Sequence, residues 1–202
     1  MNSKYVIFSV IISFIFVSCN NNNSAPIPAD LSGFAIADHP GGKLQKAVSV
    51  DGNGQIKEEG ELLDGLKTGA WITYFPEEGR VKSVTNYING KKNGLHLVFN
   101  PRGYVEKQCF YTEDQLNGPY MTFKSSTRKK VQGYYKMGIL NGKYNEYNDR
   151  NGKLLKEMTY TNGKLDGQFK QYNDEGELII EYQYKDGTKI SGGIVTSSES
   201  GN

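Results

Sequence analysis

The chain has 202 residues, enough for one domain or at most two, and it contains 24 glycines and 14 tyrosines. This composition favours strands joined by many turns over long helices, because glycine is costly inside helices and tyrosine is favoured in strands. Lysine and arginine number 24 and aspartate and glutamate 22, so the net charge of +2 argues against a nucleic-acid partner. With two histidines and two cysteines, we expect no enzyme activity, no cofactor and no metal site.

The chain begins with a segment typical of exported proteins. Residues 5–17 are almost wholly apolar and follow a positive charge at Lys4. As a helix this segment would span about 20 Å, short of the about 30 Å hydrocarbon core, so it predicts a signal peptide over residues 1–18. The next motif, Phe16-Val17-Ser18-Cys19, resembles the lipobox of bacterial lipoproteins and implies cleavage before Cys19 and lipid attachment to it. A plain signal peptide with an incidental cysteine is the alternative.

The stretch after the cysteine is polar, contains proline and lacks an apolar period. Residues 19–40 are therefore expected to be a lipidated Cys19 followed by a flexible tether, with the membrane as the first partner. Asn20 stands where an aspartate would retain a lipoprotein at the inner membrane of Gram-negative bacteria. By resemblance to that sorting rule, we expect a lipid anchor in the cell envelope at the outer membrane.

Turn residues recur along the rest of the chain with a period of about 24 residues. The first mark of each unit is Gly65, Gly90, Asp114, Gly138, Gly163 and Gly187. A second glycine follows four residues later, at Gly69, Gly94, Gly118, Gly142 and Gly167. Many marks are Asn-Gly or Asp-Gly pairs, which supply the positive φ of tight hairpin turns, so we interpret both marks as turns.

Aromatic residues repeat with the same period. Two residues past the second glycine lie Trp71, His96, Tyr120, Tyr144 and Phe169. Five past it lie Tyr74, Phe99, Phe123, Tyr147 and Tyr172, and three before each first mark after Gly65 lie Tyr87, Tyr111, Tyr135, Tyr160 and Tyr184. Tyr144 and Tyr147 are three apart in one predicted strand, so either a bulge intervenes or both faces of the sheet carry aromatics.

These segments have the length and composition of strands, and one isolated hairpin would be marginally stable. We therefore predict an all-β fold in which β-hairpin repeats stack into one elongated antiparallel sheet. The array is expected over residues 41–187, with a degenerate first unit at 41–65, and a cap fragment and disordered tail over 188–202.

The unit from Gly163 to Gly176, GKLDGQFKQYNDEG, resembles a MORN-type repeat, in the variant found in bacterial proteins labelled YwqK-family antitoxins. The resemblance covers residues 65–187 well and 41–65 weakly. It implies a grooved sheet of hairpins that contacts protein or membrane, and it implies no catalytic residues.

The function expected from these features is that of a non-enzymatic scaffold or protein-interaction module. The possible partner-binding face is Trp71, His96, Tyr120, Tyr144 and Phe169, although packing also accounts for His96 and for the Tyr87 column. The family label suggests an alternative, an immunity or antitoxin-type protein. Cys109 lies in a strand-like run and is expected to be a small buried or half-buried residue. The loop that begins at Asp51 hints at a calcium site but is better explained as a repeat turn.

Overall fold

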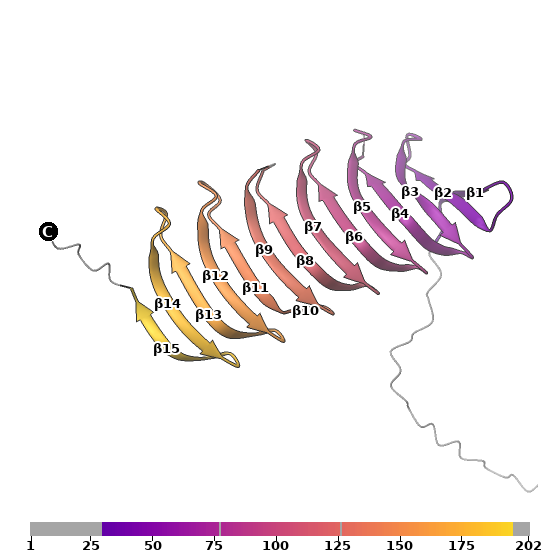
Figure 1. Cartoon of the computed structure of the whole chain (residues 1–202). Coiled ribbons are helices and arrows are strands. Elements are labelled where there is room, and N and C mark those ends of the chain that lie inside the picture. Colours follow the sequence, from indigo (N-terminus) through magenta and orange to yellow (C-terminus); the bar gives the residue numbers. More distant parts are fainter. Residues whose placement is uncertain (1–29, 77, 126, 196–202) are drawn as a thin grey trace, which may run out of the picture.

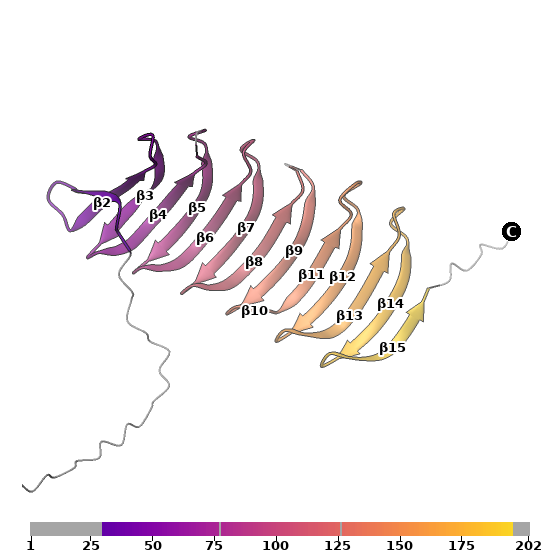
Figure 2. The ribbon, with the colours of Figure 1, turned by 180° about the vertical axis from the view of Figure 1, so that it is seen from behind.

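The computed structural model describes residues 30–76, 78–125 and 127–195, so the predicted signal peptide and Cys19 lie outside the described residues. The described chain forms one open antiparallel sheet of 15 strands, and the strands lie side by side in sequence order (Figure 1). Seen from behind, the sheet is a curved ribbon with its first and last strands at opposite ends (Figure 2). The predicted all-β sheet of stacked hairpins is confirmed.

The first two strands of the sheet, β1 (Phe34–Asp38) and β2 (Leu44–Val50), precede the repeated hairpins. The first strands of the hairpins that follow are β3 (Ile56–Leu63), β5 (Val81–Ile88), β7 (Val105–Thr112), β9 (Lys129–Lys136), β12 (Leu154–Thr161) and β14 (Leu178–Lys185). The second strands are β4 (Leu66–Tyr74), β6 (Lys91–Phe99), β8 (Gln115–Phe123), the short β10 (Ile139–Leu140) with β11 (Gly142–Tyr147), β13 (Lys164–Tyr172) and β15 (Thr188–Ile194). No helix in these ranges is long and apolar enough to cross a membrane.

Each hairpin closes with a two-residue turn in which both residues have positive φ. Asn89 and Gly90, for example, have φ of 50° and 79°. This geometry matches the right-handed twist of the flanking strands. The Gly90 amide also donates to the carbonyl of Lys67 in the preceding hairpin, at 2.9 Å, and the equivalent bond recurs in every later unit. The first glycine column therefore both turns the chain and joins neighbouring units.

The second glycine of each unit does not make a turn, so this part of the sequence interpretation is wrong. Gly167 lies inside β13 with φ of 125°, at a β-bulge where Thr159 of β12 faces three residues of the neighbouring strand. An added Cβ at Gly167 would lie 3.0 Å from the Cβ of Thr159. The glycine is needed for its positive φ and for this close approach.

A second bulge lies near the other end of each hairpin and settles the question of Tyr144 and Tyr147. The extra residue is Leu155 in β12, because Glu146 pairs with Lys156 and Tyr147 pairs with Leu154. Strand β11 itself is regular over this stretch, so Tyr144 and Tyr147 point to opposite faces. Both faces of the sheet carry aromatic side chains.

The N-terminal end of the sheet holds its most buried cluster. Ala47, Leu62 and Trp71 are 0–2% exposed, and Leu31 and Phe34 pack against them. Residues 34–38 form β1, so this part of the predicted tether is a strand of the sheet. The first described residues therefore cap the array, because they cover the aromatic side chain of its first full unit.

Candidate interaction face and inter-turn grooves

One face of the sheet carries two parallel rows of aromatic side chains. We call Trp71, His96, Tyr120, Tyr144 and Phe169 the aromatic row, and Tyr87, Tyr111, Tyr135, Tyr160 and Tyr184 the tyrosine row. Each member of the aromatic row packs edge-to-face on the tyrosine-row residue of the following strand, with ring centroids 5.5–6.3 Å apart. Such pairs contribute about 0.5–1.5 kcal/mol beyond their area burial. The two rows form a continuous ladder along the array.

The aromatic row alternates with smaller residues on the intervening strands. Cys109 of β7 pairs with His96 on one side and Tyr120 on the other, and its side chain is fully buried. The expected burial of Cys109 is confirmed. An added Cβ at Gly60 would overlap the indole of Trp71, and one at Gly133 would lie 2.9 Å from Cδ2 of Tyr144. The large rings therefore lie over small neighbours in the same row.

The five residues of the predicted partner-binding face are not equivalent. Trp71 is 2% exposed, and its indole nitrogen donates to the Glu61 carbonyl at 2.9 Å. The ring of Phe34 packs edge-to-face on it at 5.9 Å, so Trp71 belongs to the core and is not accessible to a partner. The other four members of the row are half-buried, and they lie together on one face as predicted.

His96 is held neutral by its surroundings. Burial, together with the charges of Lys107 and Lys92, lowers its pKa to about 4. Its Nδ1 lies 2.9 Å from the hydroxyl of Thr85, which pairs with it across the strands. The arrangement fits a packed aromatic residue, because a neutral ring next to a hydroxyl can stay half-buried at low cost.

The tyrosines of the ladder are also perturbed by burial. Burial and the neighbouring Cys109 raise the pKa of Tyr111 to about 12, and burial raises the pKa of Tyr120, Tyr144 and Tyr160. Their hydroxyl groups therefore stay neutral near pH 7 and offer hydrogen bonds rather than charge. Chemically, the ladder is an apolar surface with polar tips, which is the character of side chains that bind proteins.

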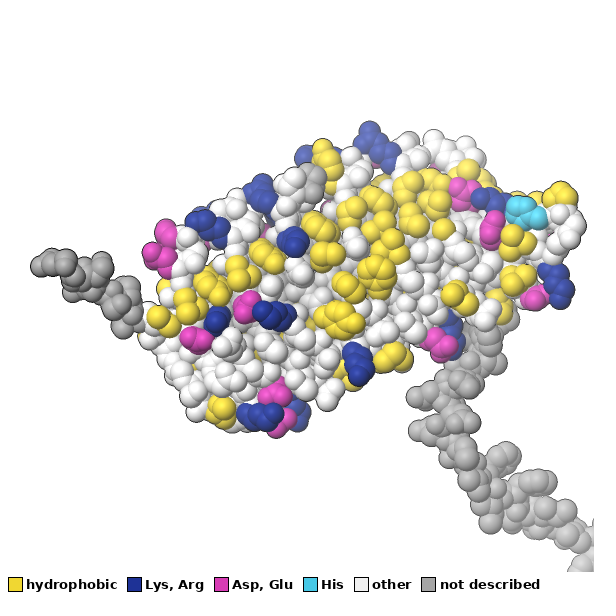
Figure 3. Space-filling model, viewed as in Figure 1, with side chains coloured by type: hydrophobic (Ala, Val, Ile, Leu, Met, Phe, Trp, Pro, Cys, Tyr) yellow, Lys and Arg dark blue, Asp and Glu magenta, His cyan; other side chains and the backbone are white. Residues whose placement is uncertain are grey.

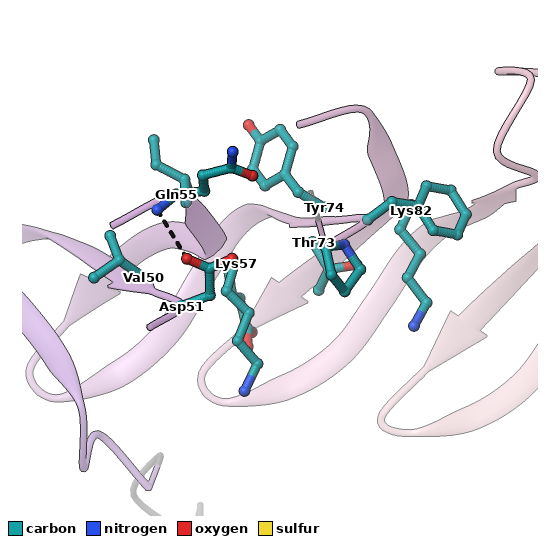
Figure 4. A pocket seen from close by; sticks show the side chains of 11 residues that line it. Val50, Asp51, Gln55, Lys57, Thr73, Tyr74 and Lys82 are labelled. Atoms are coloured by element: carbon teal, nitrogen blue, oxygen red, sulfur yellow. Dashed lines mark hydrogen bonds between the residues drawn. The ribbon is translucent and has the colours of Figure 1, made fainter. Parts of the chain in front are cut away.

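We call the loops that join one hairpin to the next the long turns. Grooves lie between successive long turns, and they were not predicted from the sequence. One groove of about 440 Å³ lies between the loops that follow β2 and β4 (Figure 4). Its lining includes the apolar Val50, Ile56 and Phe75, and Lys57 and Lys82 extend in the same direction from the two neighbouring hairpins. The equivalent repeat positions line a second groove of about 470 Å³ between β9 and β12, where Asn148 replaces Phe75.

These grooves arise from the bulges at the long turns. Lys57 and Lys82 are the bulged residues of their strands, as Lys130 and Leu155 are in the second groove. A space-filling view shows hydrophobic side chains gathered over β4 to β7, toward the ends of the strands at which the long turns lie (Figure 3). The sequence signal was present in Phe75-Pro76, which departs from the polar residues that begin the later long turns.

The suspected calcium loop is an ordinary turn. The Asp51 carboxylate accepts hydrogen bonds from the backbone amides of Asn53 and Gln55, at 2.8 and 3.0 Å (Figure 4 shows the second bond). Asn100 makes the same pair of bonds in the third long turn, to Arg102 and Tyr104. Within the described ranges, no three His, Cys, Asp or Glu side chains converge to hold a metal ion.

Comparisons with known proteins identify no family. No family model matches the chain, and no curated protein matches it. Among solved structures, one match is a mutant of S. aureus TarM in complex with fondaparinux, α-GlcNAc-glycerol and UDP, with a TM-score of 0.30 and 12% sequence identity. The match covers 67% of this chain and spans 21% of that protein, well under two thirds of its length. At this similarity it carries no argument about function.

Proposed function

We propose that this protein is a non-enzymatic lipoprotein that is anchored to the cell envelope through lipid on Cys19 and binds a partner protein on its repeat sheet. The observation that carries the proposal is the ladder of half-buried aromatic residues on a single-layer sheet. A surface of this kind combines rigid aromatic contact area with hydrogen-bonding tips. The MORN-like repeat and the lipobox-like motif, both read from the sequence, support the scaffold role and the anchor.

Photocrosslinking tests the binding face without a truncation that would destabilise the array. A photoreactive phenylalanine analogue at Tyr120 or Tyr144, in the full chain expressed in its native envelope, is expected to capture one discrete partner. The matched control is Tyr134, which follows Gly133 in β9 and so points to the opposite face, where it is 48% exposed. Equal capture from Tyr134 and Tyr120, or capture from neither, would contradict the proposed face.

The anchor needs a separate test. Intact mass of the wild-type protein is expected to show an acylated N-terminal Cys19, and Cys19→Ser is expected to lose fatty-acid labelling. The buried chains contribute about 0.8 kcal/mol for each CH₂, so two or more long chains hold the protein at a membrane. Fractionation alone is insufficient, because an uncleaved precursor would still carry the apolar residues 5–17. An unmodified Cys19 in the mature protein would rule out the anchor.

A further inference from the structure

The groove between the long turns that follow β2 and β4 combines an apolar lining with two lysines. We call it the first groove. Its volume of about 440 Å³ lies within the range of small-molecule sites, about 300–1,000 Å³. Val50 and Ile56 line it and are 53% and 43% exposed, so much of their apolar surface faces solvent. Phe75 lines it from the other loop. An apolar ligand would gain free energy by covering these side chains.

The acidic side chains that line the first groove are already engaged within the fold, whereas its lysines are not. The Asp51 carboxylate accepts two backbone amides of its own turn, and Glu58 pairs with Lys67 at 2.6 Å. Lys57 and Lys82 form no ion pair with any described residue. Both lysines extend in the same direction from neighbouring hairpins (Figure 4). The groove therefore offers positive charge to a ligand.

The positive and apolar parts of the first groove lie next to each other. The ammonium of Lys82 is 6.0 Å from the ring centroid of Phe75. A ligand whose anionic group met Lys82 would thus place its body against the ring. The apolar surface also continues beyond the groove, because Ile56 and Tyr74 line a neighbouring hollow of about 360 Å³. This arrangement suits an elongated ligand with one anionic end.

The repeat itself does not require this chemistry. The second groove, between β9 and β12, has a similar volume of about 470 Å³ and is built from equivalent positions. Asn148 stands there in place of Phe75. The bulged residue is Leu155 in place of Lys82. The fold forms a groove at both places, but of these two the first alone joins a pair of lysines to an aromatic ring.

We propose that the first groove binds a small amphiphilic carboxylate. The hydrocarbon chain of this ligand lies on Val50, Ile56 and Phe75. Its carboxylate meets the ammonium groups of Lys57 and Lys82, with which it forms charge-assisted hydrogen bonds. A neutral chain would use the apolar half of the groove alone, so it should bind more weakly. The lining includes no member of the aromatic row or the tyrosine row, so this site is independent of the proposed partner-binding face.

Photolabelling in the native envelope tests this site on the full chain. The probe is a benzophenone carboxylate, which is an aromatic anion that inserts into nearby C–H bonds when illuminated. Mass spectrometry of the peptides is expected to place the label on residues 50–58 and 73–76. Decanoate should compete with the probe, and decanol should compete at least about fivefold less well, because the alcohol carries no charge for the lysines. Label spread over the whole sheet, or lost equally to both competitors, would overturn the proposal.

Two variants take their residues from the second groove. Phe75→Asn and Lys82→Leu are each expected to reduce labelling at least about fivefold, since one removes apolar contact and the other removes charge. Lys130→Leu is the matched control, because Lys130 is the bulged lysine of the second groove, and it should leave labelling unchanged. Far-UV circular dichroism of the purified variants checks that the sheet is intact. If Phe75→Asn and Lys82→Leu fold and are labelled like the wild type, the first groove is not the site.

Other sources of an anion with an apolar body are distinguished by competition. If added vesicles of phosphatidylglycerol remove the label and decanoate does not, the ligand is a phospholipid headgroup. If a soluble acidic peptide removes the label and decanoate does not, the groove binds a protein segment. Either result would replace the small carboxylate as the occupant, whereas displacement by decanoate alone supports it.

Discussion

Replacing Gly60 with alanine should place a methyl group against the one tryptophan of the chain. Gly60 lies in β3 beneath the indole of Trp71, and an added Cβ would overlap that ring. The ring cannot move aside easily. Its nitrogen donates to the Glu61 carbonyl, Phe34 packs on its edge, and the ammonium of Lys67 lies 3.8 Å from its centroid.

The expected cost follows from overpacking. Inserting a methylene into a well-packed site typically costs about 1–3 kcal/mol, and the full burial of Trp71 favours the upper part of this range. Gly133→Ala should cost less, because its Cβ would lie 2.9 Å from a ring atom of Tyr144, which is only half-buried. Gly52→Ala is the control, since its Cβ would meet nothing within 4 Å.

The assay is denaturant unfolding followed by tryptophan fluorescence. Trp71 is the single tryptophan, so its emission reports the N-terminal end of the array alone, which matters because repeat arrays need not unfold in one step. Gly60→Ala is expected to lower the midpoint of this transition and to shift native emission toward the red. If Gly60→Ala unfolds at the same midpoint as Gly52→Ala, the packing of Trp71 over Gly60 is refuted.

Three further predictions concern single side chains. The pKa of His96 is about 4 in the folded protein and about 6.5 in the unfolded chain, so the free energy of unfolding should fall by about 2 kcal/mol between pH 7 and pH 5. His96→Phe should remove this part of the pH dependence, as measured by urea unfolding at the two pH values. Cys109 is fully buried and burial raises its thiol pKa, so it should react with a maleimide only under denaturing conditions; rapid labelling of native protein would contradict this. Met137 has a positive φ of 48° in a tight turn, so Met137→Asn should stabilise by about 0.5–1 kcal/mol, and a lower melting temperature would count against the turn geometry.

The repeat and its tight turns could be predicted because they depend on local chemistry. Asn89-Gly90 and Asn162-Gly163 close hairpins as expected, since positive φ at two successive positions is a requirement that a short sequence reveals. The same periodicity identified the aromatic row. Even Glu113-Asp114, which lacks glycine, adopts the turn, because the hairpins on both sides fix its place.

The bulges could not be predicted, because they depend on pairing between strands. Asn93-Gly94 has the same composition as Asn89-Gly90, but it lies within β6, opposite Asn86 of β5. Only the register between the two strands distinguishes a turn glycine from a bulge glycine. The grooves at the long turns were missed for the same reason, since their bulged residues look like ordinary strand residues in the sequence.

The N-terminal cap was missed because it depends on contacts with residues far along the chain. Phe34 and Leu31 lie in a segment without strong periodicity. Their apolar side chains pack against the cluster that contains Trp71, and no pattern in the sequence indicates this contact. The boundary of a tether cannot be set from composition when a few apolar residues within it pack on the first repeat.

A single-layer sheet must bury its aromatic side chains against neighbours in the same face, and this explains why its two ends differ. Inside the array each ring of the ladder has a neighbouring hairpin on both sides, so one repeated unit suffices. At the first end, Phe34 supplies the missing neighbour of Trp71. At the last end, Phe169, Tyr182 and Tyr184 pack on one another, and β15 adds Gly192 where an aromatic would stand opposite Tyr182. The ammonium of Lys189 in β15 lies 4.1 Å from the ring centroid of Tyr182, so a lysine side chain of the last strand covers the ring that has no further hairpin beside it.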